Sequence, residues 1–283
     1  MGTNESAPNA STASFLRVRG LSKRYVRRKA LWRRSTPVVA LRDVSFEIAA
    51  GKTLALVGSS GSGKSTVARC VTRLEKPDAG EVWLGETDIS RLEHRDLVPL
   101  RPLMQMVFQD SVTSLNPRFT AAEIIEEPLR IQRRGNRNER RNHARELMTE
   151  VGLSPNWADR PATQFSGGQR QRLAIARSLV LQPKLLVLDE ALSGLDLSTQ
   201  AQIANLLLDL QDARSLTYLF ISHDLALVAR LADVIAVMSA GQVVEQGPAA
   251  QITSHPEHPE TRSLLSSALA FQNSYAATLA GRV

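Results

Sequence analysis

The sequence predicts an α/β fold with a mainly parallel sheet, and two observations lead to this prediction. Short apolar runs typical of strands alternate with helix-like segments along much of the 283-residue chain. One of these runs, Leu185–Leu188, is continuously apolar, as expected for a central strand that is covered on both faces. The composition agrees, because 43% hydrophobic and 22% charged residues are typical of a globular protein.

The expected elements follow from this alternation. The strand-like runs are Phe15–Val18, Val44–Ile48, Thr53–Val57, Glu81–Leu84, Met104–Phe108, Leu185–Leu188, Tyr218–Ile221 and Val234–Met238. The helix-like segments are Lys64–Arg73, Gln169–Leu181, Ser198–Ala213 and Leu225–Leu231. Strands separated by helices in this way are typical of βαβ units, in which neighbouring strands run parallel.

Three other parts of the chain differ from this pattern. Residues 1–14 are polar and are expected to form a disordered tail ahead of a main domain at 15–247. Within that domain, about 110–162 reads as a helical insertion, because Thr120–Ala162 holds no convincing strand and Glu139–Val151 has helical spacing. Residues 248–283 begin with a stretch rich in Ser, His and Pro, followed by the weakly amphipathic Thr261–Leu269, and are expected to form a C-terminal appendage.

Charge and cysteine content limit the possible partners and compartment. The net charge is +7, which favours nucleic acid, anionic lipid or a phosphorylated small molecule as a partner. The single cysteine, Cys70, permits no disulfide within the chain and fits a reducing compartment. No run approaches the roughly 18 consecutive apolar residues of a membrane-spanning helix, and no secretory signal is expected.

A phosphate-binding loop lies between an expected strand and an expected helix, which is the context that this motif requires. Residues 58–65 fit the pattern G-x-x-x-x-G-K-[ST]. Its glycines let backbone N–H groups point at phosphate oxygens, and the helix N-terminus adds a positive end. Lys64 can then reach the β- and γ-phosphates, and the Ser65 hydroxyl can bind Mg²⁺. The residues expected to contact nucleotide here are Gly58, Ser59, Ser60, Gly61, Ser62, Gly63, Lys64, Ser65 and Thr66.

Two acids follow the apolar strand at 185–188. In an α/β sheet the carboxyl ends of the strands face the ligand crevice. Asp189 at such an end can hold Mg²⁺, directly or through water, and Glu190 can polarise a water for attack on a γ-phosphate. Together with the phosphate loop, these acids predict an enzyme that hydrolyses a nucleoside triphosphate.

A further motif points to a family. Phe165-Ser166-Gly167-Gly168-Gln169 opens a helix-like stretch and resembles the signature motif of ABC-transporter ATPase subunits. The other family motifs appear in the family's order: Tyr25 resembles the aromatic residue that stacks on adenine, Gln109 the Q-loop, Ser193–Asp196 the D-loop and His223 the H-loop. The resemblance covers about 15–247, which is most of the chain.

The resemblance implies a more detailed fold and a complete site. The fold is an ABC-type P-loop nucleotide-binding domain with a mainly parallel core sheet, an antiparallel β subdomain and a helical insertion. The implied cofactors are ATP and Mg²⁺. The implied catalytic residues are Glu190 as general base, His223, Gln109 and Lys64, and the implied metal ligands are Ser65, Gln109 and Asp189. Outside the phosphate loop, the residues expected to contact nucleotide are Tyr25, Ser166, Gly167, Gly168, Gln169 and Asp196.

The signature motif also predicts an assembly. Ser166–Gly168 lie at an expected helix N-terminus and therefore form a second anion site. Two anion-binding helix starts in one chain suggest a head-to-tail dimer. In the family that the chain resembles, the signature of one subunit closes on the γ-phosphate held by the other.

Three segments resemble the oligopeptide, dipeptide and nickel import branch, especially its second ATPase subunit. They are a basic insertion at Arg27–Arg34, Ser114–Arg118, and His258–Leu265, which is the most diagnostic. The resemblance implies two integral-membrane permease subunits and a second ABC ATPase as partners, with a heterodimer favoured over a homodimer. It implies a solute-binding protein as an indirect partner and a peripheral location on the cytoplasmic face of the plasma (inner) membrane.

The expected function is therefore ATP hydrolysis that powers a membrane importer for di-/oligopeptides or a related solute. The alternative is a soluble ABC ATPase acting on nucleic acid or ribosomes, but the paired domains, long coiled coils or zinc-binding insertions of such proteins are missing. The arginine-rich stretch Arg130–Arg145 lacks interleaved aromatic residues, so we expect a solvated helix face near anionic lipid and no nucleic acid. The alternative is a specific subunit contact, because the helical insertion contacts the membrane subunits in the family that the chain resembles. The transported solute need not touch this chain, and its identity is not readable from the sequence.

Overall fold

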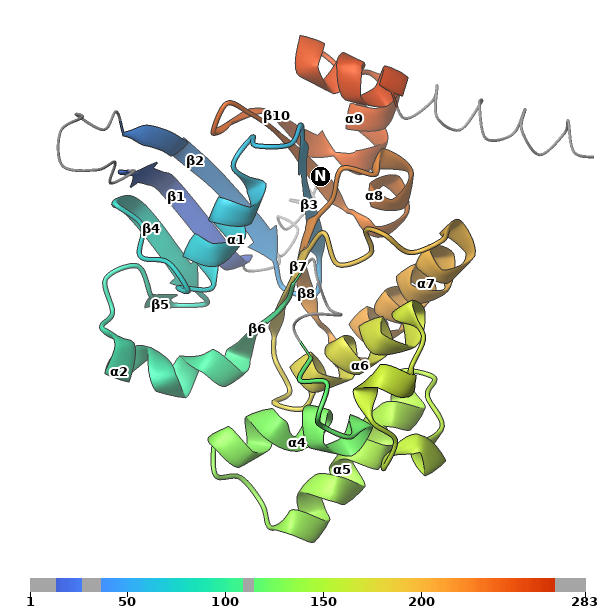
Figure 1. Cartoon of the computed structure of the whole chain (residues 1–283). Coiled ribbons are helices and arrows are strands. Elements are labelled where there is room, and N and C mark those ends of the chain that lie inside the picture. Colours follow the sequence, from blue (N-terminus) through green and yellow to red (C-terminus); the bar gives the residue numbers. More distant parts are fainter. Residues whose placement is uncertain (1–13, 27–36, 109–114, 268–283) are drawn as a thin grey trace, which may run out of the picture.

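Two sheets form the framework of the molecule (Figure 1). The computed structural model describes residues 14–26, 37–108 and 115–267. One sheet has four strands in the order β2-β1-β4-β5, and the other has six in the order β10-β9-β3-β8-β7-β6. Helices cover the six-stranded sheet, so the predicted α/β class is confirmed.

The four-stranded sheet is antiparallel throughout. Its strands are β1 (Ser14–Tyr25), β2 (Val38–Ala49), β4 (Ala79–Leu84) and β5 (Thr87–Asp88). In β1, alternating residues such as Leu16 and Val18 are fully buried because one face of this sheet packs on the core. Tyr25 ends β1 and pairs with Val38 at the start of β2.

The six-stranded sheet is parallel except at one edge. Its strands are β3 (Thr53–Gly58), β6 (Met104–Val107), β7 (Leu185–Asp189), β8 (Thr217–Ile221), β9 (Val234–Ser239) and β10 (Gln242–Pro248). Only β10 runs antiparallel to its neighbour, β9. The central strands β3, β7 and β8 are buried along their whole length, which explains their unbroken apolar sequences.

The helices connect these strands. They are α1 (Lys64–Val71), α2 (His94–Leu97), η1 (Val98–Leu103), α4 (Ala121–Ile131), α5 (Arg137–Glu150), η2 (Pro155–Trp157), η3 (Ala162–Gln164), α6 (Gly167–Leu179), α7 (Leu197–Arg214), α8 (Leu225–Leu231) and α9 (Ala249–Ser254). A last helical segment covers 259–267. Helices α4 and α5 lie together below the sheets in Figure 1, away from the antiparallel sheet.

The six-stranded sheet separates two hydrophobic cores. In β7, Leu185 and Val187 pack with α1 and the antiparallel sheet, whereas Leu186 and Leu188 pack with helices α4 to α8. This division follows from the two-residue period of a strand, which sends successive side chains to opposite faces. The carboxyl ends of β3, β7 and β8 therefore lie between two rigid packing layers.

Most of the expected elements are confirmed. Each of the eight apolar runs lies in an observed strand, apart from Phe108, which follows β6, and each of the four helix-like segments overlaps an observed helix. The segment with helical spacing at 139–151 corresponds to α5, which has a capping box made by Asn136 and Glu139. The expectation of no strand at 120–162 agrees with a single isolated bridge between Thr120 and Pro161.

Three elements differ from the expectation. Strands β5 and β10 are not among the predicted strands, and β1 includes Ser14, which was expected in the disordered tail. The tail residues 1–13, the basic insertion at 27–34 and the first residues of the expected helical insertion, 110–114, lie outside the described residues.

Candidate functional site

The phosphate loop joins β3 to α1 and depends on two glycines. A Cβ atom on Gly58 would lie 2.2 Å from the carbonyl oxygen of Met238, so no other residue fits between β3 and β9. Gly63 is the N-cap of α1 at φ +107°, and a Cβ atom there would lie 2.6 Å from the carbonyl oxygen of Ala40. The turn at 59–61 between them is exposed, and no side chain caps α1. The first N–H groups of the helix are therefore available to an anion.

Lys64 is folded into this loop. Its ammonium donates hydrogen bonds to the carbonyl oxygens of Gly58 and Ser59, each at 2.9 Å, and to the Ser62 hydroxyl at 3.4 Å. Burial lowers the pKa of Lys64, and the nearby carboxylates of Glu190 and Asp189 oppose this shift. The ammonium can exchange carbonyl oxygens for phosphate oxygens by small rotations of its side chain.

The side chains of Ser65 and Asp189 meet at the carboxyl edge of the six-stranded sheet. The Ser65 hydroxyl at the start of α1 donates to Asp189 Oδ1 at 3.0 Å, at the carboxyl end of β7. Asp189 is only 5% exposed, and burial raises its pKa although the Ser65 hydrogen bond and neighbouring cations act in the opposite direction. Two hard oxygen donors this close fit the chemistry of Mg²⁺, which prefers carboxylate and hydroxyl ligands.

Glu190 and His223 face each other at the ends of β7 and β8. The backbone at Glu190 turns through φ +46°, and its N–H donates to the carbonyl oxygen of Ile221 at 3.0 Å. The turn is held by Ser193, whose hydroxyl donates to the Glu190 carbonyl oxygen at 2.7 Å. Glu190 Oε2 lies 3.7 Å from Nδ1 of His223, and the two side chains line a cavity of about 70 Å³ with Gly194. The cavity volume suffices for a water molecule beside the carboxylate.

Tyr25 lies beside α1, as a base-stacking residue near the phosphate loop would. Its ring is partly buried, and its hydroxyl donates to the carboxylate of Glu75, a residue that sequence reasoning missed. Thr66, the last residue of the predicted phosphate-loop set, also acts on this hydroxyl from α1. Nothing in the sequence around Glu75 signals this contact, because the two residues are 50 positions apart.

The signature residues begin α6, as predicted. Ser166 is the N-cap, and its hydroxyl accepts from the N–H of Gln169, whose own side chain accepts from the N–H of Ser166 at 2.9 Å. This capping box uses Gln169 to stabilise the helix start. A Cβ atom on Gly167 or Gly168 would meet Leu195 or Thr199, respectively, so the signature helix packs closely against the start of α7.

Asp196 has a structural role in this chain. It is the N-cap of α7 and accepts from the N–H of Thr199 at 2.9 Å and from the Thr199 hydroxyl at 2.7 Å. These hydrogen bonds lower the pKa of Asp196. Gln109, the predicted Q-loop residue, lies outside the described residues, so no contact is assigned to it.

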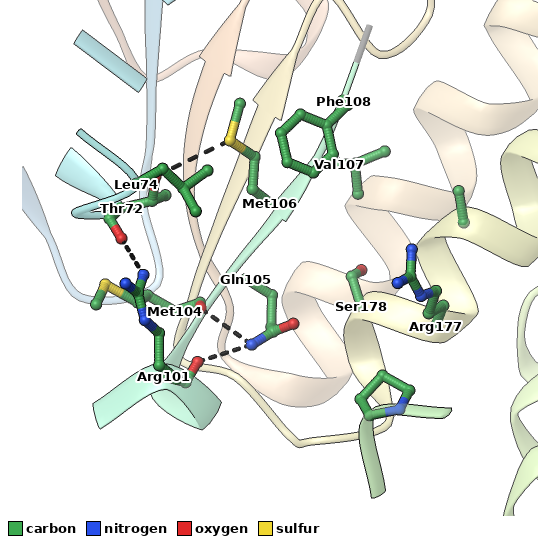
Figure 2. A pocket seen from close by; sticks show the side chains of 12 residues that line it. Thr72, Leu74, Arg101, Met104, Gln105, Met106, Val107, Phe108, Arg177 and Ser178 are labelled. Atoms are coloured by element: carbon green, nitrogen blue, oxygen red, sulfur yellow. Dashed lines mark hydrogen bonds between the residues drawn. The ribbon is translucent and has the colours of Figure 1, made fainter. Parts of the chain in front are cut away.

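A groove of about 390 Å³ opens next to the end of β6 (Figure 2). On one side of it lie Leu74 and Arg101, and on the other lie Arg177 and Ser178 of α6. Leu74 is 52% exposed and Phe108 is 43% exposed, so the groove has apolar surface on its rim. In the described part of the chain, no helix is both long and apolar enough to span a membrane.

Comparison with known proteins identifies the family. The model of the ABC transporter family matches residues 41–193, which is more than half of the chain. The chain belongs to the ABC transporter family. A probable peptide ABC transporter ATP-binding protein of Sinorhizobium fredii is 46% identical over 90% of this chain and 72% of its own length. The dipeptide transport ATP-binding protein DppF of Haemophilus influenzae is 44% identical over 93% of this chain and 80% of its own length.

Solved structures agree with the fold of this ABC protein. A dimeric ATP-binding cassette, MJ0796, in a post-hydrolysis state with ADP and Pi, has a TM-score of 0.73 and 30% identity over 83% of this chain and 98% of that chain. The cbiO1 protein of Clostridium perfringens has a TM-score of 0.74 and 26% identity over 86% of this chain and 92% of that chain. The ABC protein is an ATP-binding ATPase, as predicted, and the alternative of a soluble ATPase acting on nucleic acid is not favoured.

Proposed function

We propose that this ABC ATPase powers a membrane importer for di-/oligopeptides or a related solute. The observation that carries the proposal is the convergence of Lys64, Ser65, Asp189, Glu190 and His223 at the carboxyl ends of three adjacent strands. The class of solute rests on the relatives, whose names describe peptide and dipeptide transport.

The phosphate loop and Lys64 hold the triphosphate. The free N–H groups at the start of α1 point along the helix axis, where its positive end attracts the phosphates. Lys64 is already desolvated, so a phosphate oxygen replaces a carbonyl oxygen at little cost. Ser65 and Asp189 are the residues that would hold Mg²⁺, and the ion would supply neutralisation of the phosphate charge.

Glu190 is the proposed general base for hydrolysis. Its carboxylate would accept a proton from the attacking water, and the bond between the γ-phosphorus and the bridging oxygen would break to give ADP and phosphate. His223 would hold the water and the γ-phosphate in line from the neighbouring strand, and its side chain is 63% exposed and free to turn towards a ligand. Gln109 completes the proposed catalytic set as a metal and water ligand.

The signature residues would act in trans. Ser166, Gly167 and Gly168 begin a helix whose contacts run to α7 and not to the phosphate loop of the same chain. We therefore propose that they, with Asp196 nearby, meet the nucleotide of a second ABC ATPase subunit, with a related chain favoured over an identical one. ATP then joins the two subunits, and its hydrolysis releases them.

The groove at the end of β6 is the proposed contact with one of two integral-membrane permease subunits. Its exposed apolar side chains lie between α6, which begins with the signature, and the segment after α1, the helix that begins with the phosphate loop. A permease segment seated there would sense movement of either element. The ATPase would then be peripheral, on the cytoplasmic face of the plasma (inner) membrane, and a solute-binding protein would be an indirect partner.

The decisive experiment compares wild type with Glu190→Gln in the complex with its permease and ATPase partners. We expect Glu190→Gln to lower ATP turnover by at least ~10²-fold while ATP binding persists, because the amide cannot accept the proton. Glu146→Gln, which changes an exposed acid on α5, should leave turnover unchanged. Unchanged turnover in Glu190→Gln would exclude it as the base.

The solute is tested separately. Vesicles containing the complex, supplied with internal ATP, should accumulate a labelled dipeptide only when the ATPase carries Glu190. ATP hydrolysis that is not stimulated by any di- or oligopeptide with the binding protein would contradict the peptide proposal and leave the ATPase assignment intact.

A further inference from the structure

The end of β1 is fastened to the segment that follows α1. The Tyr25 hydroxyl donates to Glu75 Oε2, and Glu75 Oε1 lies 3.3 Å from Nη1 of Arg69 on α1. The N–H of Glu75 donates to the carbonyl oxygen of Arg69 at 3.1 Å, so the backbone of Glu75 lies against the C-terminal end of α1. Its carboxylate therefore reaches back along α1 and joins the tyrosine to the helix that begins with the phosphate loop.

A second group of contacts fixes the same strand end. The Lys23 ammonium lies 5.8 Å from the centroid of the Tyr25 ring. It donates to the carbonyl oxygen of Lys76 at 2.7 Å and to Asp78 at 3.2 Å, and Asp78 also accepts from the N–H of Arg24 at 2.7 Å. Residues 75–78 thus hold both the hydroxyl and the backbone of this strand end.

The hydroxyl of Tyr25 is a stable hydrogen-bond donor at neutral pH. Burial, together with the hydrogen bond and charge of Glu75, raises its pKa above the ordinary tyrosine value, and Thr66 opposes this shift only in part. The tyrosine is therefore neutral, and Glu75 accepts its proton in a hydrogen bond without taking it. This bond fixes the position of the hydroxyl end of the side chain and therefore restrains its first torsion, χ1, which decides where the ring lies.

We propose that Glu75 is a positioning residue that holds the Tyr25 ring at a fixed place relative to the phosphate loop. The proposal rests on the proposed role of Tyr25 as the adenine platform. A ring that is already oriented loses less conformational freedom when a base stacks on it, so binding of the nucleotide is tighter. Glu75 would thus contribute to the affinity for the base without touching the nucleotide.

The test separates base binding from phosphate binding by titrating purified chain with ATP and with tripolyphosphate. In Glu75→Ala we expect ATP affinity to fall by roughly 3- to 10-fold, as for the loss of one hydrogen bond. Tripolyphosphate affinity should stay within about 2-fold, because the phosphate loop is intact. Glu75→Gln keeps an acceptor and should recover most of the ATP affinity. Glu86→Ala, an exposed acid on the same sheet, is the matched control.

A double-mutant comparison tests the coupling itself. Tyr25→Phe should match Glu75→Ala, and the double variant should be no weaker than either single variant, because both remove the same bond. Additive losses, or an equal fall in tripolyphosphate affinity in Glu75→Ala, would overturn the proposal. Tyr25→Ala separates the stacking role of Tyr25 from the positioning role of Glu75. If Tyr25→Ala leaves ATP affinity unchanged, Tyr25 is not the residue on which the base stacks. If Tyr25→Ala weakens ATP but Tyr25→Phe and Glu75→Ala do not, only the tether is wrong.

Discussion

Asp189 and Glu190 are neighbours in the sequence but lie in different environments. Asp189 ends the buried strand β7 and has little contact with solvent, whereas Glu190 lies on a left-handed turn beside a small cavity. Burial of a carboxylate is costly unless a cation or several hydrogen bonds compensate. The two acids are therefore suited to different tasks, one to hold a cation and the other to accept a proton from water.

The cost of burying Asp189 predicts a stabilising substitution. Since its pKa is raised in the folded state, the native protein binds the proton more tightly than the unfolded chain, and the free energy of unfolding falls as pH rises above the ordinary value of 3.8. Because Asn cannot ionise, the Asp189→Asn variant does not lose this part of the free energy of unfolding as pH rises. We expect Asp189→Asn without nucleotide to unfold about 2–4 °C higher than wild type at pH 7, which corresponds to ~1 kcal/mol.

Thermal unfolding of both proteins from pH 8 down towards the ordinary carboxyl pKa of 3.8 checks this sign. The gain in Asp189→Asn should shrink towards the acidic end, and Mg²⁺-dependent hydrolysis should be lost at every pH. A lower unfolding temperature at pH 7 would show that the charged hydrogen bond from Ser65 outweighs the cost of burial.

Sequence reasoning at this scale succeeds where a motif is local. The phosphate loop was predictable because its glycines, Lys64 and Ser65 act through one continuous turn, whose steric demands the pattern encodes. The link between Tyr25 and Glu75 was not predictable, because it joins a strand end to a helix end through side chains alone. The assignment of nucleotide contacts to the phosphate loop, Tyr25, Asp196 and the signature residues stays a prediction.

At the scale of elements, helices α6 and α7 meet at their N-termini. A Cβ atom on Gly168 would lie 2.5 Å from Cγ2 of Thr199, so the glycine is required by close packing. The same threonine donates its hydroxyl to Asp196. One side chain therefore joins the signature helix to the segment that precedes α7, which gives these two motifs a fixed separation.

This packing predicts a rescue experiment. Gly168→Ala should lower the free energy of unfolding by about 1–3 kcal/mol, because the methyl group forces the two helices apart. Adding Thr199→Ser removes Cγ2 but keeps the hydroxyl, and should restore a large part of the loss. Urea denaturation measures both effects.

Gly167→Ala is the matched control, since a Cβ atom there would lie 3.6 Å from Leu195, an ordinary contact. It should change stability by less than ~0.5 kcal/mol. If Gly168→Ala is equally mild, or if Thr199→Ser does not restore stability, the close contact is not what requires the glycine.

Elements with strong periodicity were predicted, whereas the two-residue strand β5 and the weakly patterned strand β10 were missed. The buried strands carry unbroken apolar runs that only a doubly covered strand explains. Strand β10 is an edge strand of half-buried and exposed residues that ends in Gly247 and Pro248. Proline is tolerated there because an edge strand leaves one side unpaired, so its sequence resembles a loop.

For the whole molecule, Glu245 connects the last helical segment to the six-stranded sheet. Its carboxylate on β10 accepts from the N–H groups of Glu257 and His258 and from the Thr261 hydroxyl. Burial alone raises the pKa of Glu245, but these hydrogen bonds outweigh it and leave the pKa lowered. The contact thus stabilises the folded state above the ordinary pKa of 4.5 and loses its contribution as pH falls through the lowered value.

Glu245→Ala should therefore release residues 257–267 from the sheet. We expect faster amide exchange in that segment at pH 7, with little change in β3 or β7, because its N–H groups lose their acceptor. In wild type the same protection should weaken as pH falls below about 4.5, whereas Glu245→Ala should show no such pH dependence. Unchanged exchange in the variant would mean that Thr261 and its neighbours are held by other contacts.

A substitution in the groove at the end of β6 would test how the ATPase joins a larger assembly. Phe108 and Leu74 both line the groove and are 43% and 52% exposed, so a partner that covers them would remove this apolar surface from water. Phe108→Glu places a charge in that contact and should reduce recovery of the chain with its permease subunits by ~10-fold or more, since a charge desolvated in an apolar interface is costly. Affinity for ATP should stay unchanged, because Phe108 is separate from the phosphate loop.

Ile131→Glu is the matched control, because Ile131 is an apolar residue on α4 that is 68% exposed and does not line the groove. This variant should assemble normally. Equal loss of assembly in both variants, or in neither, would place the docking surface elsewhere on the molecule.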